Sequence, residues 1–231
     1  MGTLPKSFSR TKALINVFDR KGQRASEGYL RLEANLQASG TYTFQVNANA
    51  NQLITETRLR SGDAFIPTKV GMFLRTVATA TDANQTTSVL QTYPNTTAFT
   101  SSTTVANLES LYNSRLQITI NSVNLTEFID TIRFRRITAA QQGLAVSAVA
   151  TTGVMSKSAW ENENYGMSNF EQDCCFNGQA NNTCQVILPT AVDCGAGATV
   201  QNYLVILFRG VLVQDGAKFV NDKSLRTFSA S

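Results

Sequence analysis

The chain of 231 residues contains no histidine. Histidine is the usual general base of serine and cysteine hydrolases and a common ligand of zinc. Its absence excludes the histidine-dependent triads, the HExxH zinc motif and every metal site that needs an imidazole. We expect a protein that is not an enzyme and that needs no metal and no cofactor.

Charged residues, prolines and long apolar runs are also scarce. Charged residues make up 16% of the chain, against roughly 25% in an average soluble domain. Only four prolines are present, so no proline-rich linker divides the chain. The longest apolar run, Tyr203–Phe208, is far shorter than the roughly 20 residues that span a bilayer. We expect no transmembrane segment, and the first thirty residues show no secretory signal.

Threonine and asparagine supply much of the polarity that charged residues do not. The chain holds 28 Thr and 19 Asn, while 42% of its residues are apolar. Threonine is β-branched and favours strands, and asparagine favours turns. The composition therefore predicts a β protein, and the length is sufficient for one domain with a substantial core.

Alternation of apolar and polar residues supports this fold class. Tyr42, Phe44 and Val46 alternate with polar residues, which is typical of a strand with one buried face. Helices are expected only as short pieces, such as those near 105–113 and 125–130, and Asp215-Gly216 predicts a two-residue hairpin turn. Strands are expected near 29–36, 41–48, 54–60, 65–77, 88–92, 116–121, 131–137, 144–150, 184–190 and 201–213. The sequence predicts an all-β fold, an antiparallel β-sandwich with short helices and long loops.

The positive charge is concentrated at the N-terminus. Residues 1–31 contain seven basic and two acidic residues, whereas the rest of the chain contains 13 basic and 14 acidic residues. We interpret 1–28 as a basic arm and 29–231 as the β domain. The arm is expected to be ordered by neighbouring subunits or by genome phosphates rather than by its own domain; a solvated tail is the alternative. Its basic residues are Lys6, Arg10, Lys12, Arg20, Lys21 and Arg24.

Four cysteines, Cys174, Cys175, Cys184 and Cys194, lie within a short stretch. Their spacing does not follow the paired pattern of zinc sites. Disulfides and reduced structural thiols both remain open. Any bridge is expected to join Cys174 or Cys175 to Cys184 or Cys194, because adjacent cysteines bond only with strain.

The order of several segments resembles the viral jelly-roll capsid proteins, especially those of tailless bacteriophages. The residues that carry the likeness are the arm at 1–31, Gly40–Val46, Arg58–Phe65 leading into Val70–Leu74, Thr92–Asn95, Leu108–Asn113, Arg115–Asn121 and Tyr203–Gly216. About ten expected strands fit a single jelly roll better than a double one, because each roll uses about eight strands. The resemblance implies a virion protein that binds copies of itself and other virion proteins.

A second functional class remains open beside the virion protein. A carbohydrate-binding or adhesin-like β-sandwich would also use loops rich in Thr, Asn and Gln, which hydrogen-bond sugar hydroxyls. Such sites usually add an aromatic stacking platform, for which the single tryptophan, Trp160, and six tyrosines offer modest material. A protein that forms symmetric oligomers would favour the first class, and a monomer retained on glycan resin would favour the second.

Overall fold

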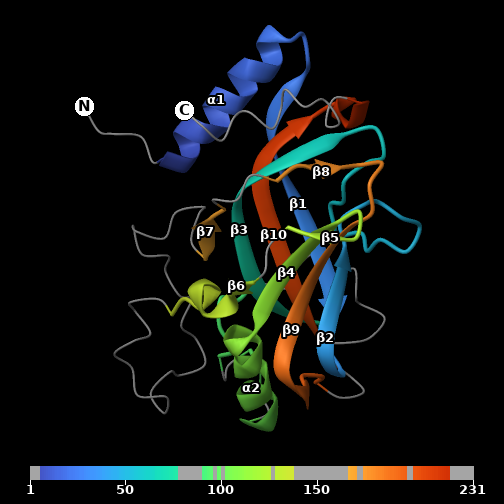
Figure 1. The fold of residues 1–231 in the computed structure, drawn as a ribbon. Coiled ribbons are helices and arrows are strands. Elements are labelled where there is room, and N and C mark those ends of the chain that lie inside the picture. The colour runs from blue at the N-terminus through green and yellow to red at the C-terminus, as the bar shows by residue number, and fades with distance from the viewer. Residues whose placement is uncertain are drawn as a thin grey trace.

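The protein is an antiparallel β-sandwich with a few short helices (Figure 1). The structure, a computed structural model, describes residues 6–77, 90–95, 98–99, 102–125, 128–137, 166–170, 174–196 and 200–218. The expected strand at 144–150 lies outside these residues. The all-β prediction and the prediction of a sandwich are confirmed.

Two sheets form the sandwich, and most of their strands lie where alternation predicts them. Sheet A has the order β1-β10-β3-β7, and β8 pairs with β3 beside β7. Its strands are β1 (Ala25–Asn35), β10 (Gln201–Val213), β3 (Ala64–Val77), β7 (Met167–Asn169) and β8 (Phe176–Asn177). Sheet B has the order β2-β9-β4-β5, and β6 also pairs with β4. Its strands are β2 (Ala38–Gln45), β9 (Asn182–Asp193), β4 (Arg115–Ile120), β5 (Val123–Asn124) and β6 (Ile129–Asp130).

The core lies between the sheets and is built from the inward residues of each strand. Tyr42, Phe44 and Val46 are all buried, as their alternation predicts. The ring of Phe208 on β10 meets Phe176 edge to face, with 5.4 Å between ring centroids. This arrangement joins the long strand β10 to the short strand β8.

Five helical elements accompany the sheets in the described part of the chain. The helix α2 (Ser102–Glu109) continues into the 3-10 helix η2 (Ser110–Asn113), which confirms the expected helix near 105–113. It lies at the end of the sandwich opposite the N-terminal helix α1 (Lys6–Arg20) (Figure 1). Two further 3-10 helices are η3 (Thr131–Phe134) and η5 (Gly216–Lys218).

Several local predictions are wrong. Residues 129–130 form β6 rather than part of a helix at 125–130. Residues 131–134 form η3 instead of a strand, because the Asp130 carboxylate accepts a hydrogen bond from the Ile132 amide and caps the turn. In the segments 54–60 and 88–92, the described residues contribute only isolated bridges.

The Asp215-Gly216 turn does not lead into a hairpin within the described residues. Asp215 has the positive φ that such a turn needs, at 52°. Gly216, however, begins η5, and the Ala217 amide donates to the Gly62 carbonyl. This hydrogen bond holds the chain that follows β10 against the turn before β3, so the chain does not fold back to pair with β10.

Candidate functional site

The basic arm folds as a helix that packs on its own domain. Phe18 is 4% exposed and lies in a cluster with Ala64, Val211 and Val213 on the outer side of sheet A. Leu14 also contacts this cluster. The prediction that the arm is ordered by neighbouring subunits or genome phosphates rather than by its own domain is therefore wrong for this helix. Leu14 and Phe18 lie four residues apart, the spacing of one helix face.

The predicted arm cations divide between the protein and the solvent. Arg10 donates from Nη1 to the Phe170 carbonyl at 2.9 Å and so helps to fasten the helix. Lys12 and Arg20 are exposed on the other side of α1, and Lys21 and Arg24 are exposed just after it. The Lys6 side chain lies outside the described part of the structure. The helix thus presents cations to solvent while its apolar side is buried.

The four cysteines are free thiols. Cys174, Cys184 and Cys194 are buried in the main core, and Cys175 packs beside the cluster that holds Phe18. Burial raises the pKa of the Cys184 thiol well above its ordinary value. These residues behave as small apolar side chains, which corresponds to the reduced alternative left open by the sequence.

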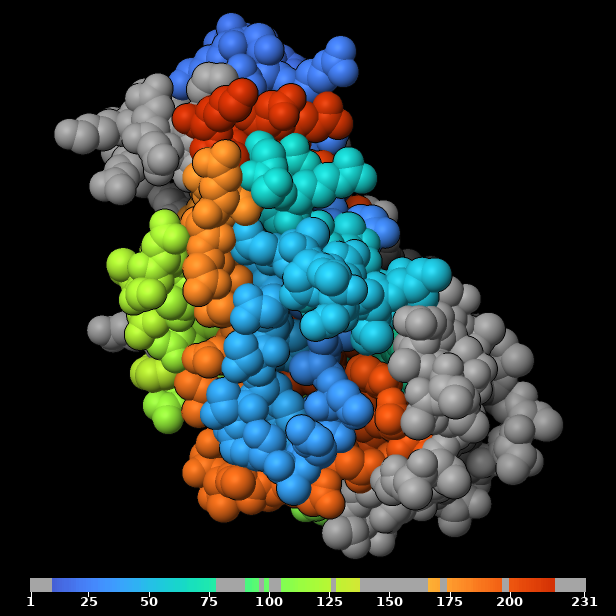
Figure 2. Space-filling model, turned by 90° about the vertical axis from the view of Figure 1, so that its right-hand side faces the viewer, coloured from blue at the N-terminus to red at the C-terminus, as the bar shows by residue number. Residues whose placement is uncertain are grey.

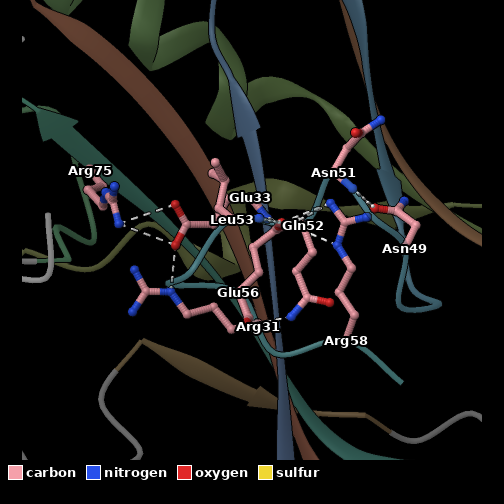
Figure 3. Close-up of polar contacts among 9 residues, drawn as sticks. All are labelled: Arg31, Glu33, Asn49, Asn51, Gln52, Leu53, Glu56, Arg58 and Arg75. Carbon is pink, nitrogen blue, oxygen red and sulfur yellow. Dashed lines mark hydrogen bonds and ion pairs between the residues drawn. The ribbon is translucent and has the colours of Figure 1, made fainter. Parts of the chain in front are cut away.

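A buried ionic cluster on sheet A was not anticipated from the sequence. Glu33 on β1 lies between two arginines: Arg31 Nε is 2.8 Å from its Oε1, and Arg75 Nη1 of β3 is 3.3 Å from its Oε2 (Figure 3). The side chains of Glu33 and Arg75 are 0% and 1% exposed. Arg75 also lies over the ring of Tyr203, 5.2 Å from its centroid. The cluster spans the three neighbouring strands β1, β10 and β3.

Glu56 extends this cluster into the connection between β2 and β3. Its carboxylate accepts hydrogen bonds from the amides of Glu33 and Leu53 and forms an ion pair with Arg58 at 2.8 Å (Figure 3). Both carboxylate oxygens are thereby occupied by groups of the protein itself. The cluster fastens the connection to the margin of sheet A, where Thr57 and Arg31 exchange main-chain hydrogen bonds of 2.8 and 2.9 Å. We assign it a structural role.

The outer faces of the two sheets differ in exposure. On sheet A, Phe73, Tyr203 and Val205 point away from the core and are nevertheless buried. The apolar strand β10 is therefore covered on both faces within its own domain. On sheet B, the residues that alternate with the core side chains remain open to solvent.

The open face of sheet B is polar and almost free of charge. The registers align Thr43 with Gln185 and Gln117, flanked by a row of Gln45, Thr183 and Thr119 and by a row of Thr41, Ile187 and Arg115. Gln185 donates to Thr43 at 3.2 Å. We call these nine residues the polar face. Arg115 is its only charged member.

An apolar ridge borders the polar face. Val123, Leu125, Phe128 and Ile132 are 61%, 41%, 51% and 48% exposed, and together we call them the apolar rim. The Arg115 guanidinium lies 4.3 Å from the centroid of the Phe128 ring, which connects the rim to the polar face. The green to yellow-green atoms of this part of the chain project at the left of Figure 2.

Other site chemistry is sparse in the described part of the chain. No group of three or more Cys, Asp or Glu side chains comes together there in a way that could hold a metal ion. No helix among these residues is long and apolar enough to cross a membrane. No family model matches the chain, and no curated protein matches it in sequence. The fold and the exposed surfaces are therefore the basis for a functional proposal.

Proposed function

We propose that this protein is a structural subunit of a virus particle, a jelly-roll capsid protein that self-assembles. The observation that carries the proposal is the nested pairing of the strands. The first long strand pairs with the last, β1 with β10, and the second with the second-last, β2 with β9. Then β3 pairs with β7 and β8, and β4 pairs with β5 and β6.

This nesting is what one long antiparallel hairpin produces when it is rolled up. Successive partners alternate between the sheets, so that both ends of the hairpin meet in sheet A and its tip lies in sheet B. A jelly roll has this strand connectivity, with eight strands and two Greek keys, and the fold occurs in viral capsid and lectin domains. The proposal joins this topology to the capsid-like order of segments in the sequence, because fold alone does not imply function.

The distribution of surfaces also suits a shell subunit. On the outer face of sheet A, α1 packs on one end and the apolar side chains are buried. The margin of the sheet at β1 is closed by the segment around Thr57. Sheet B presents the polar face and the apolar rim. The exposed cations Lys12, Arg20 and Arg24 offer a second surface that could meet genome phosphates. In this proposal the protein is located in the virion, with other copies of itself and further virion proteins as partners.

Light scattering coupled to size-exclusion chromatography, with negative-stain microscopy of each peak, tests the proposal. We expect the mass to rise with concentration through discrete oligomers that show symmetry in the images. A protein that stays monomeric up to millimolar concentration and at every salt concentration would contradict it. Circular dichroism on the same samples checks that the β fold is present.

The polar face favours carbohydrate binding as the second candidate function. Gln117 and Thr183 lie diagonally across the adjacent strands β4 and β9 and make no side-chain hydrogen bond with the described residues. Phe128 supplies an exposed aromatic ring at the margin of the same face. This candidate predicts a monomer that is retained on immobilised neutral glycans and loses retention when Gln117 is replaced by Ala. A monomer without glycan retention would contradict both candidates.

A further inference from the structure

We propose that the apolar rim is the contact through which one copy of the chain binds the body of the next, in a head-to-tail arrangement. This inference rests on the proposed function, because it names the surface by which the subunit would assemble.

The concentration of exposed apolar side chains is the first observation. Six large apolar residues are exposed in the described part of the chain, and four of them form the rim. The other two, Tyr29 and Ile54, lie elsewhere. Single exposed apolar residues are ordinary, whereas a group bordered by polar residues marks an interaction site. The rim therefore needs a partner that covers it.

The cations beside the rim are arginines, and this choice favours a protein partner. Arg115, Arg133 and Arg136 are all exposed along the same stretch of chain. Arginine and aromatic residues are enriched in protein interfaces, whereas lysine is depleted. The stacking of Arg115 on Phe128 preorganises both side chains before binding, so that less conformational entropy is lost when a partner binds.

Apart from the margin at β2, the described sheet margins favour contact through side chains rather than through strand addition. On sheet A, β1 is bridged by Thr57, and the far margin of β3 is bridged by β8, β7 and Gln91. On sheet B, β5 and β6 are only two residues long, whereas β2 is an eight-residue margin strand, and only the chain just after it, at Asn47, forms a bridge, with Leu59. Figure 2 shows the blue-to-cyan connection between β2 and β3 across the margin of the sandwich. Short or covered margins resist pairing with another chain.

The distribution of charge distinguishes a two-fold contact of rim against rim from a head-to-tail contact of rim against body. Residues 115–137 contain four basic and two acidic residues, a net charge of +2. The remainder of the β domain, residues 29–114 and 138–231, contains ten basic and 12 acidic residues, a net charge of −2. A two-fold contact of rim against rim would place arginines against arginines. A heterologous contact places the basic rim on the net-negative remainder of a neighbour and so avoids that repulsion.

The experiment compares rim variants of the full chain with a matched control. The double variant Leu125→Ser/Phe128→Ser removes two side chains that are at least 41% exposed, so that the fold should be retained. Ile54→Ser is the control, because it makes the same kind of change at a residue that is 76% exposed outside the rim. We expect the double variant to need at least about tenfold more protein to form the oligomer, and the control to stay within about twofold of wild type.

A charge variant tests the head-to-tail arrangement. Arg133→Glu/Arg136→Glu should also weaken assembly at low salt, and the difference from wild type should shrink as salt screens the contact. Stronger assembly of this variant would overturn the head-to-tail arrangement, because it would mean that arginines face arginines. An oligomer that stops at a dimer but still depends on the rim would overturn it as well.

The remaining outcomes distinguish a failure of the rim inference from a failure of the proposed function. If wild type assembles and the Leu125→Ser/Phe128→Ser variant assembles equally well, the rim is not the contact and the proposed function stands. If wild type never self-associates, both fail. Vesicles of phosphatidylcholine with phosphatidylglycerol provide the last comparison. Rim-dependent binding to them, with assembly unaffected, would assign the rim to a lipid surface and overturn the inference.

Discussion

Glu33→Gln should be among the most damaging single changes in this protein. The substitution leaves the Arg75 guanidinium, which is 1% exposed, without the carboxylate that lies 3.3 Å away. Removing one partner of a buried ion pair costs about 3–5 kcal/mol, because the remaining charge loses its counter-charge in the protein interior. That is a large part of the roughly 5–15 kcal/mol by which folded proteins are stable. For a chain of this size the midpoint of thermal unfolding should fall by about 6–20 °C.

Two further variants make this prediction precise. Arg31→Ala removes an ion pair to the same carboxylate, but the Arg31 side chain is 22% exposed, so the expected cost is about 1 kcal/mol or less. Glu33→Leu/Arg75→Met removes both charges and should recover most of the lost free energy of unfolding. Urea denaturation followed by circular dichroism measures all three. If Glu33→Gln costs no more than Arg31→Ala, the cluster is solvated and our reasoning about its burial is refuted.

Three further outcomes are expected. Phe18→Ala should lower the free energy of unfolding by about 3–4 kcal/mol in the same urea assay, because this ring anchors α1 on sheet A; an unchanged midpoint would mean that the helix is not docked. Ellman's reagent should titrate four thiols in the unfolded, unreduced protein and react slowly with the native protein at pH 8; two or fewer thiols would reveal a disulfide. Stability should decline as the pH rises above about 8.5, because burial raises the pKa of Cys184 and the folded state keeps a proton that the unfolded state loses. Cys184→Ala should flatten that decline in urea titrations at pH 7 to 10, and an equal slope in both proteins would exclude Cys184 as its source.

Alternation predicted the long strands well because one face of each strand must be buried. Tyr42, Phe44 and Val46 show this on β2, where all three reach the core. The same pattern failed at Ile132 and Phe134, where local hydrogen bonds compete with it. The Thr131 hydroxyl lies 2.7 and 2.8 Å from the carbonyls of Leu111 and Ser114, and this contact stabilises a tight turn.

The candidate surfaces and the ionic cluster could be predicted only in part. Glu33 and Arg75 alternate with apolar residues, so the sequence places them on a polar face that would normally be solvated. Nothing local shows that this face is covered, because the cover comes from distant parts of the chain. The apolar rim could not be predicted from the sequence for a similar reason. Val123, Leu125 and Phe128 look like ordinary core residues in the sequence, and only the fold shows that they face outward.

The position of β9 and β10 has a consequence for synthesis of the protein on the ribosome. The strand β9 (residues 182–193) is an inner strand of sheet B and β10 (residues 201–213) is an inner strand of sheet A, yet both are translated after every other strand that the structure describes. Until they emerge, β1 and β3 have no shared neighbour, and neither do β2 and β4. The nascent chain thus carries unpaired strands that are prone to aggregation, and its closing step depends on contacts distant in sequence, which form slowly. Sheet B cannot be completed before β9 has been made, nor sheet A before β10, so the sandwich acquires its finished surfaces only after residue 213 has been translated.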